Sequence, residues 1–455
     1  MSTFSGINIA RRGLTAAQLG MDVTGQNVAN ANTDGYSRQR VEQSASVLNQ
    51  TGQFAQKNIP GDGVSVTSIA RVSDALATST ARQDSAASKE QAAASSVWQT
   101  IENAIGDTGA TGLSQSLQDL GSAWNTLANN NGVTGQAGDR QLVLTRSAAV
   151  VSTISSMSNQ LQAQYGSLSL QASALATQAN TAASNIASLN TSIRETLSTG
   201  ASANELMDQR DQYLNQLADL TGSRVVNRDN GTVDVFVGNA TIVTGDFHYD
   251  LKLSVPDPAN PGQTIGNPQI GAQIVATIGG MDAAPVTGSL KGTLDGANKT
   301  LPDQKGKLDA FAATLTTTVN AATGATFFAA AGGGTVTSAN IVLAATSVQE
   351  STSAAGDGST DRKFAKQVVA AFGDVKQNWR TSVTNLASST QSASNRADLA
   401  SQVSLKSASV ADSVSGVNLD EEMTNLVAYQ HAYSAAAKVL TTMDEALDTL
   451  LNMVR

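Results

Sequence analysis

Residues 419–454 read LDEEMTNLVAYQHAYSAAAKVLTTMDEALDTLLNMV, and an apolar side chain returns in them at every seventh position. A seven-residue apolar repeat is typical of an α-helix that packs lengthwise against another helix. Asn418 precedes the repeat and Glu421 follows three residues later, a spacing that predicts a capping box at the start of this helix. The repeated positions, which we interpret as a C-terminal assembly seam, are Leu419, Leu426, Tyr433, Leu440, Leu447 and Val454.

The N-terminal residues carry the same repeat, so a second helix of this kind is expected at the other end of the chain. The positions of this N-terminal assembly seam are Ile7, Leu14, Met21 and Val28. Gly6, Gly13 and Gly20 share another position of the repeat. Each glycine costs a helix about 1 kcal/mol, so this helix is expected to be weak alone but to let a neighbouring helix come close.

The N-terminal helix is expected to stop within NVANANTDGYSRQR, residues 27–40. Asn, Asp and Gly favour turns and left-handed backbone conformations, which end helices. We assign Asn30, Asn32, Gly35 and Tyr36 to this helix-stop motif. An ordinary C-cap followed by a loop accounts for the stop equally well.

Neither terminal helix is expected to be stable without a partner. Burying about ten seam side chains offers roughly 15–30 kcal/mol, whereas ordering the backbone of the C-terminal helix costs on the order of 36–70 kcal/mol. The two ends are therefore expected to pack together, and also against copies or relatives in other subunits. The alternative is an intramolecular helix pair that closes one domain.

Between the two ends, the apolar pattern predicts a helical region that is interrupted by strands. Residues 224–238, RVVNRDNGTVDVFVG, change to an alternating pattern around an Asn-Gly hairpin signal, and strand-like and Gly/Pro-rich sequence continues to about residue 295. Helices are expected at residues 72–107, 113–128, 139–199, 204–222, 303–322 and 361–411.

The predicted fold is mainly α with an inserted β domain, and each inner domain is nested within the one outside it. Residues 1–40 and 416–455 are expected to form a terminal domain in which the two helices make a coiled-coil-like pair. Residues 41–224 and 297–415 are expected to form a long-helix bundle, and residues 225–296 an outer β domain.

The composition argues against several classes of protein. Charged residues make up 14% of the chain, against roughly 25% in ordinary globular proteins, and the net charge is -9. An acidic chain without a polybasic run is not expected to bind nucleic acid or an anionic membrane surface. Without cysteine or an apolar stretch of about 18 residues, neither disulfides nor bilayer-spanning helices are expected. The N-terminus also lacks the apolar core of a cleavable signal peptide.

No catalytic residue, metal ligand or cofactor is predicted. The two histidines, His248 and His431, are too few for a histidine metal triad, and the commonest zinc-protease, serine-hydrolase and P-loop motifs are missing from the sequence. Asp208 and Asp211 could be posed as paired carboxylates, but they flank Arg210 on a predicted amphipathic helix and are better explained as salt-bridged surface. The chain is therefore not expected to be an enzyme.

Several of these stretches resemble the bacterial flagellar axial family of rod, hook and hook-associated proteins. NVANANTDGYSRQ is similar to the motif that follows their N-terminal helix, and residues 413–454 resemble their C-terminal helix in its hook-associated form. NELMDQRDQYLNQLADLTGSRV at 204–225, followed by a β insertion and by GSLKGTLDG at 288–296, is similar to the proteins of the first hook–filament junction.

This resemblance implies a structural protein that forms a ring of subunits and joins the hook to the filament as an adaptor. The implied partners are further copies of the chain, the hook protein, the second junction protein and a flagellar export chaperone that binds the C-terminal helix. The implied location is the flagellum outside the cell, reached through the flagellar type III apparatus without a cleavable signal peptide. The terminal helices would line an inner tube, the helix-stop motif would turn the chain outward, and the β domain would face outwards.

Two other interpretations stay open on the sequence. A secreted, adhesin-like protein would bind a ligand through the β insertion and use its ends only as anchors. Another axial structural protein, such as the second junction protein or a hook or rod relative, would share the terminal helices.

Overall fold

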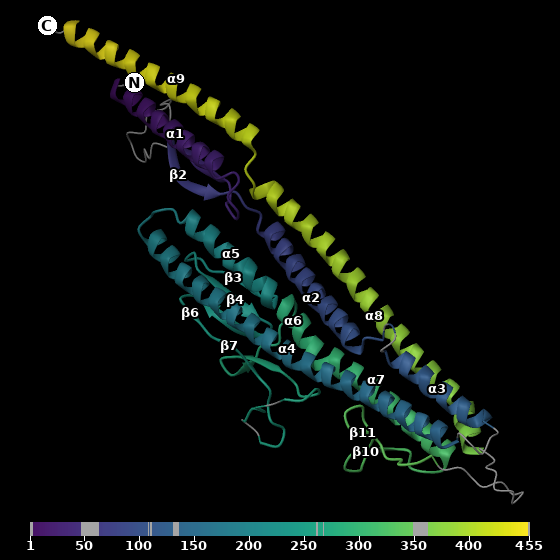
Figure 1. Ribbon diagram of the computed structural model, residues 1–455. Coiled ribbons are helices and arrows are strands. Elements are labelled where there is room, and N and C mark those ends of the chain that lie inside the picture. Colours follow the sequence, from purple (N-terminus) through teal and green to yellow (C-terminus); the bar gives the residue numbers. More distant parts are fainter. Residues whose placement is uncertain are drawn as a thin grey trace, which may run out of the picture.

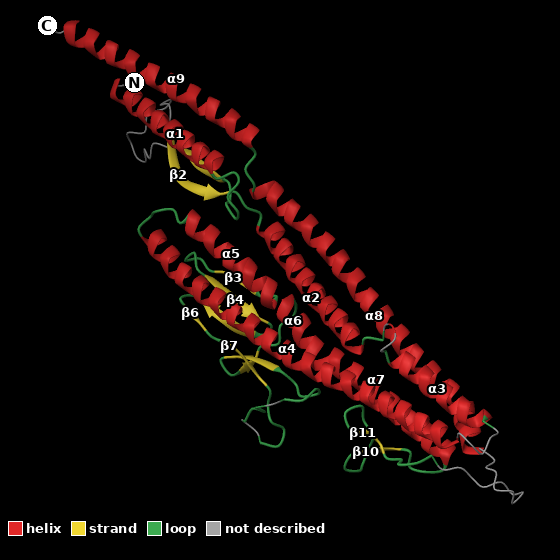
Figure 2. Ribbon diagram, in the orientation of Figure 1, coloured by secondary structure: helices red, strands yellow, loops and turns green. Residues whose placement is uncertain are grey.

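The computed structural model describes residues 3–46, 63–107, 109, 112–130, 136–260, 263–266, 268–348 and 363–453. These residues form an elongated, mainly helical molecule with α1 and α9 side by side at one end (Figures 1 and 2). The helices are α1 (Thr3–Ala29), α2 (Ala75–Ile105), α3 (Leu113–Asn129), α4 (Gln136–Ser198), α5 (Asn204–Thr221), α6 (Gly288–Asp295), the π-helix η2 (Gly296–Thr300), α7 (Leu301–Thr323), α8 (Lys363–Ser415) and α9 (Leu419–Met453). The predicted fold class, mainly α with long terminal helices and inserted strands, is confirmed.

Local signals in the sequence set the ends of the long helices. The carboxylate of Asp74 caps α2 by accepting hydrogen bonds from the backbone N–H groups of Leu76 at 2.8 Å and Ala77 at 3.1 Å. Gly106 and Gly222 end α2 and α5 in the left-handed conformation that favours glycine. The helices predicted in the middle of the chain therefore agree with the observed ones to within a few residues.

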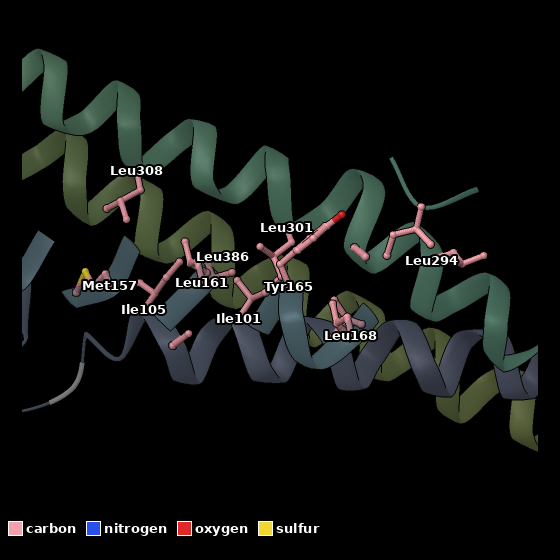
Figure 3. Packing of buried hydrophobic residues seen from close by; sticks show 14 of the residues in the cluster. Ile101, Ile105, Met157, Leu161, Tyr165, Leu168, Leu294, Leu301, Leu308 and Leu386 are labelled. Atoms are coloured by element: carbon pink, nitrogen blue, oxygen red, sulfur yellow. The ribbon is translucent and has the colours of Figure 1, made fainter. Parts of the chain in front are cut away.

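The long middle helices enclose a continuous apolar core (Figure 3). Ile101 of α2, Leu161 of α4 and Leu308 of α7 are all buried in it. The side chain of Tyr165 is also buried, and its hydroxyl donates a hydrogen bond to the carbonyl oxygen of Ala272 at 2.7 Å. That bond ties the helical core to the segment that leads into the inserted strands.

Small antiparallel sheets lie along α4 (Figures 1 and 2). One sheet has the order β3 (Arg224–Asn227), β4 (Val233–Val237), β5 (Ala240–Thr244) and β6 (Phe247–His248). A second has the order β7 (Leu251–Ser254), β8 (Val275–Ile278) and β9 (Met281–Asp282), and β10 (Phe328–Ala330) pairs with β11 (Ile341–Leu343). The hairpin predicted at residues 224–238 is confirmed, because β3 and β4 pair antiparallel around a turn with Gly231 at φ 81°.

A further hairpin, formed by β1 (Gln39–Ala45) and β2 (Val64–Arg71), corrects the sequence-based prediction. Residues 41–224 were assigned to the long-helix bundle, but these strands pack on α1. The alternation of VSVTSIAR in β2 is a genuine strand signal. It is easily missed because no short turn signal joins the strand to its partner.

The helix α6 is a second correction, since strand-like sequence was expected to continue to about residue 295. Its glycines resemble a loop composition, but they permit close packing against α2. A Cβ on Gly292 would lie 2.5 Å from the carbonyl oxygen of Glu90, and one on Gly296, the first residue of the following η2, would lie 2.6 Å from Cγ2 of Val97. Glycine is therefore required here by helix-to-helix distance rather than by a turn.

Candidate functional site

The helices α1 and α9 pack as an antiparallel pair along a single row of contacts (Figure 1). Three glycines of α1, spaced seven residues apart, face three side chains of α9 with the same spacing: Gly6 faces Met443, Gly13 faces Ala436 and Gly20 faces Tyr429. A Cβ on Gly20 would lie 2.6 Å from the Tyr429 ring. The glycines therefore let the neighbouring helix come close, as their spacing indicates.

The predicted seam residues flank this row and are only partly covered in the single chain. The half-buried ones are Ile7, Leu14, Met21 and Val28 on α1, and Leu426, Tyr433, Leu440 and Leu447 on α9. Leu419 is 48% exposed, and Val454 lies outside the described residues. The companion positions of α1, each three residues after a seam residue, are Ala10, Ala17 and Thr24, and these are fully buried. Apolar surface therefore remains accessible along both seams.

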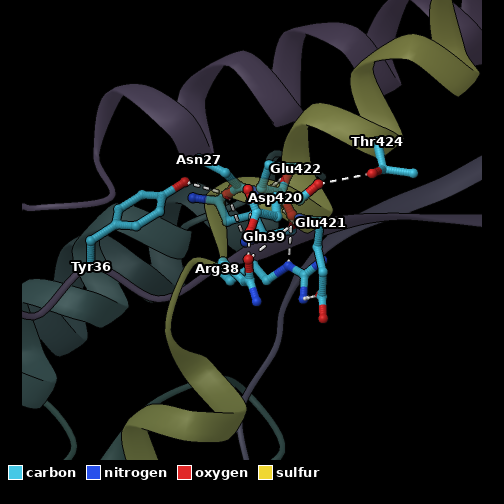
Figure 4. Close-up of polar contacts among 9 residues, drawn as sticks. Asn27, Tyr36, Arg38, Gln39, Asp420, Glu421, Glu422 and Thr424 are labelled. Carbon is cyan, nitrogen blue, oxygen red and sulfur yellow. Dashed lines mark hydrogen bonds and ion pairs between the residues drawn. The ribbon is translucent and has the colours of Figure 1, made fainter.

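At the end of this row lies a polar group that we call the junction cluster: Asn27, Tyr36, Arg38, Gln39 and Glu422 (Figure 4). Asn27 is 1% exposed and Glu422 is 2% exposed. The Asn27 amide nitrogen donates to Oε2 of Glu422 and to the carbonyl oxygen of Gln39, both at 2.9 Å. Its Oδ1 accepts from the Gln39 N–H at 3.0 Å and from the Tyr36 hydroxyl at 2.8 Å. A side-chain amide has two donors and accepts two bonds, so every position of Asn27 is filled.

Arg38 connects this cluster to the neighbouring helices. Its Nε donates to Glu422 and its Nη1 to Glu421, both at 2.8 Å. Its backbone N–H donates to the carbonyl oxygen of Ser415, at the end of α8, at 2.9 Å. One residue thus holds the chain after α1, the end of α8 and the start of α9 together.

The start of α9 is capped by Asn418, whose Oδ1 accepts hydrogen bonds from the N–H groups of Asp420 at 3.0 Å and Glu421 at 3.4 Å. Glu421 was expected to complete a capping box, but its carboxylate pairs with Arg38 instead. The reason is that an arginine in ion-pair contact is a stronger partner for a carboxylate than a backbone N–H.

The residues of the helix-stop motif have different roles. Asn30 continues the last turn of α1, since its backbone N–H and its side-chain amide both donate to the carbonyl oxygen of Gln26 at 3.0 Å. Gly35 adopts φ 77°, and a Cβ there would lie 2.4 Å from Nε2 of Gln212 on α5. Tyr36 folds back onto Asn27, whereas Asn32 is exposed. Three of the four predicted residues therefore make specific contacts at the turn.

Asp208 and Asp211 of α5 lie next to the junction cluster and correct a prediction. Both carboxylates bind Nη1 of Arg71 at 2.8 Å, and Asp208 also accepts from the Ser37 N–H at 3.1 Å. Although burial lowers the pKa of Arg71, the charges and hydrogen bonds of the two carboxylates outweigh it and raise this pKa. Both aspartates are salt-bridged, as expected, but Asp208 is 6% exposed rather than on the surface. Its partners are Ser37, which precedes β1, and Arg71, the last residue of β2.

The Tyr36 hydroxyl is held in its neutral form. Burial, followed by the negative charges of Asp208, Glu205 and Glu422, raises its pKa to about 12. A neutral phenol keeps the proton that it donates to Asn27. The cluster is thus a stable set of hydrogen bonds at neutral pH.

The arrangement suits the joining of helices. Among the described residues, there is no group of three or more His, Cys, Asp or Glu side chains placed to hold a metal ion. Over the same part of the chain, no helix combines the length and apolar character needed to cross a membrane. Sequence reasoning missed Asn27 and Glu422, although Asn27 follows Gly20 by the same seven-residue step as the glycines before it.

Comparisons with known proteins agree with one another. Residues 98–333 match the family model "Flagellar hook-associated protein FlgK helical domain". Residues 411–453 match "Flagellar basal body rod FlgEFG protein C-terminal", and residues 7–36 match "Flagella basal body rod protein". These three matches include the helix-stop motif, α9 and much of the middle region.

Individual proteins also match this chain over all or part of their length. "Flagellar hook-associated protein 1" of Bacillus subtilis is 28% identical, over 99% of this chain and 98% of that protein. The protein of that name from Salmonella typhimurium is 29% identical, over 57% of this chain and 46% of that protein. The flagellar hook junction protein FlgK from Burkholderia pseudomallei is a solved structure with 22% identity and a TM-score of 0.44, covering 56% of this chain and 44% of that one.

Proposed function

The chain belongs to the family of the flagellar hook-associated protein FlgK, and from this premise we propose that it forms the adaptor ring that joins the hook to the filament. The family is one of structural flagellar proteins, and membership implies assembly with other flagellar axial components. Adaptor rings need subunits that bind both their own kind and two different polymers.

The observation that carries this proposal is the apolar surface left uncovered on α9. Met423 and Val427 follow Leu419 at steps of four, so these three side chains share one face of the helix. They are 52%, 48% and 48% exposed, respectively. Exposed apolar side chains in a row are typical of a protein interface. In the ring, this face would pack against neighbouring subunits and the two seams would line the inner tube.

The proposed partners follow from the same arrangement. The hook protein would contact one side of the ring and the second junction protein the other. Before assembly, a flagellar export chaperone would cover the exposed face of α9, and the chain would leave the cell through the flagellar type III apparatus without a cleaved signal peptide. The inserted sheets, on the flank of α4, would face away from the tube.

Removal of the gene tests the adaptor role. Cells without this protein are expected to complete their hooks and to secrete filament protein unassembled into the medium, because the filament has nothing to attach to. Electron microscopy of the cell bodies and immunoblotting of the medium measure both effects. Filaments attached normally to hooks in these cells would rule out the adaptor role.

The exposed face of α9 has its own test. Val427→Asp is expected to leave the fold of the single chain intact and to abolish incorporation, because a charge would have to enter a dry interface. Ala435→Asp, at an exposed position on another side of the same helix, adds the same charge and is the matched control. Leu426→Asp and Leu440→Asp in the half-buried seam are also expected to block incorporation. Normal attachment of Val427→Asp subunits would contradict the interface.

One observation keeps an adhesin-like function as a second candidate. In the inserted sheets, Phe247 is 72% exposed and Tyr249 is 49% exposed. Exposed aromatic rings are common at binding surfaces. The double variant Phe247→Ser and Tyr249→Ser separates the candidates: an adhesin would lose surface binding, whereas motility would persist in either case.

A further inference from the structure

We propose that the buried pair of Asn27 and Glu422 sets the register in which α1 and α9 pack. The pair continues the glycine row by one more step of seven, since Asn27 follows Gly20 and Glu422 precedes Tyr429 by that interval. It is the polar end of the row in which glycines of α1 face Met, Ala and Tyr side chains of α9. This inference does not depend on the proposed ring.

The rest of the row does not distinguish one register from another. A glycine offers no side chain, so the α1 surface is alike at Gly6, Gly13 and Gly20. The flanking seam repeats an apolar residue at each step of seven, and the companion positions repeat Ala, Ala and Thr. Sliding α9 by seven residues, about 10.5 Å, therefore again places side chains of α9 opposite glycines of α1 and apolar seam residues beside each other. A periodic apolar contact of this kind needs a polar residue to fix its register.

The junction cluster supplies that discrimination. In the observed register, the carboxylate of Glu422 accepts hydrogen bonds from Asn27 and from Arg38 while 2% exposed. A slip of seven residues in one direction would place Tyr429 opposite Asn27, and a slip in the other would place Glu422 opposite Gly20. Either slip separates the pair and leaves a buried amide or a buried charge without its partner, which is strongly unfavourable.

Arg38 extends the same control to the neighbouring helix. Its backbone N–H binds the carbonyl oxygen of Ser415, and its guanidinium binds Glu422. The chain between these two points is only the short link from α8 to α9. The register of α9 against α1 is thereby fixed relative to the end of α8, which sets how far the terminal helix pair extends from the long-helix region.

Disulfide trapping in the full-length chain measures the register directly, because the natural sequence contains no cysteine. The pair Gly13→Cys and Ala436→Cys reports the observed register, since a Cβ at Gly13 lies 3.9 Å from Cβ of Ala436, within the roughly 3.5–4.5 Å that a disulfide spans. Gly13→Cys combined with Tyr429→Cys, or with Met443→Cys, reports the two slipped registers. These reporter pairs are about 10.5 Å apart along the helix axis in the observed register.

With the natural junction cluster, oxidation is expected to trap the observed pair at least tenfold more than either slipped pair. Adding Asn27→Leu and Glu422→Leu is expected to raise the slipped disulfides at least tenfold relative to the observed one. Asp22→Leu, an exposed position of α1, is the matched control and should change nothing. Asn27→Ala, which introduces no extra bulk, is the second variant in case the double leucine change prevents folding.

Helix content from circular dichroism accompanies each measurement. Slipped disulfides in helical variants that lack the pair, but not in the control, support the proposal. Trapping of the observed pair alone in those variants would show that the apolar row sets the register by itself. Loss of all three disulfides would show that the pair holds the helices together without choosing a register. Both of these last results overturn the proposal.

Discussion

Replacing Asn27 by aspartate changes a single nitrogen to oxygen, and we expect it to disrupt the terminal helix pair. The asparagine donates to the carboxylate of Glu422 and to the carbonyl oxygen of Gln39, both at 2.9 Å. In Asn27→Asp, both donors are lost and an acceptor faces each of these oxygens. The new carboxylate also lies next to a buried negative charge.

The magnitude follows from these contacts. A hydrogen bond to a charged group contributes about 1.5–3 kcal/mol and a neutral one about 0.5–1.5 kcal/mol. The two lost bonds together contribute about 2–4.5 kcal/mol, and repulsion between two neighbouring buried carboxylates adds to this, so a loss of about 3–5 kcal/mol is expected for the pairing of α1 and α9. Since each 1.4 kcal/mol is about tenfold, hydrogen exchange in these two helices should accelerate by about 100-fold or more.

Hydrogen exchange with mass spectrometry measures this loss segment by segment, while the core around α4 serves as an internal reference. Asn32→Asp, the same change at an exposed position of the helix-stop motif, should alter exchange by less than tenfold. Because the neighbouring charge raises the pKa of the new carboxyl group, the effect should shrink as the pH falls below about 5. Equal protection in Asn27→Asp and the unmodified chain at pH 7 would refute the account of this cluster.

Three further outcomes are expected. Gly20→Ala should destabilise the helix pair by about 1–3 kcal/mol, because the new Cβ would lie 2.6 Å from the Tyr429 ring. Gly13→Ala, whose Cβ would lie 3.9 Å from Cβ of Ala436, should be neutral or stabilising by up to about 1 kcal/mol. Thermal unfolding monitored by circular dichroism compares the two variants. Tyr36 should ionise near pH 12 in an absorbance titration against a Tyr36→Phe reference. The stability that its raised pKa contributes is therefore present below about pH 10 and lost between about pH 10 and 12. Ionisation of Tyr36 near pH 10 would contradict this. Arg71→Met should cost about 2–4 kcal/mol in denaturant unfolding because it leaves the buried carboxylate of Asp208 without its arginine, and an unchanged midpoint would contradict that role.

The helices could be predicted from the sequence because their signals are local. Caps such as Asp74 and left-handed glycines such as Gly222 lie within the elements that they end. The hairpin of β1 and β2 was missed because no short turn signal joins its strands, and the helix α6 was missed because its determinants are distant. Gly292 is explained only by the backbone of Glu90 on another helix, which no local pattern contains.

The terminal pair could likewise be predicted, but its polar end could not. The seven-residue repeats identify two helices that need partners, and the glycines identify a close approach. Asn27 was interpreted as part of a helix stop, because a polar residue is common at the end of a helix and the sequence around it does not reveal its partner. Its meaning depends on Glu422, which lies 395 residues later in the chain.

That separation in sequence has a consequence for folding. Closing a loop of nearly the whole chain carries a large entropic cost, and contacts of this range form slowly when the ends must find each other unaided. Once α2 and α8 have docked, however, the loose ends that remain are short, and Arg38 already lies near the end of α8. We therefore expect the pairing of α1 with α9 to be the last folding step and, on denaturation, the first to be lost.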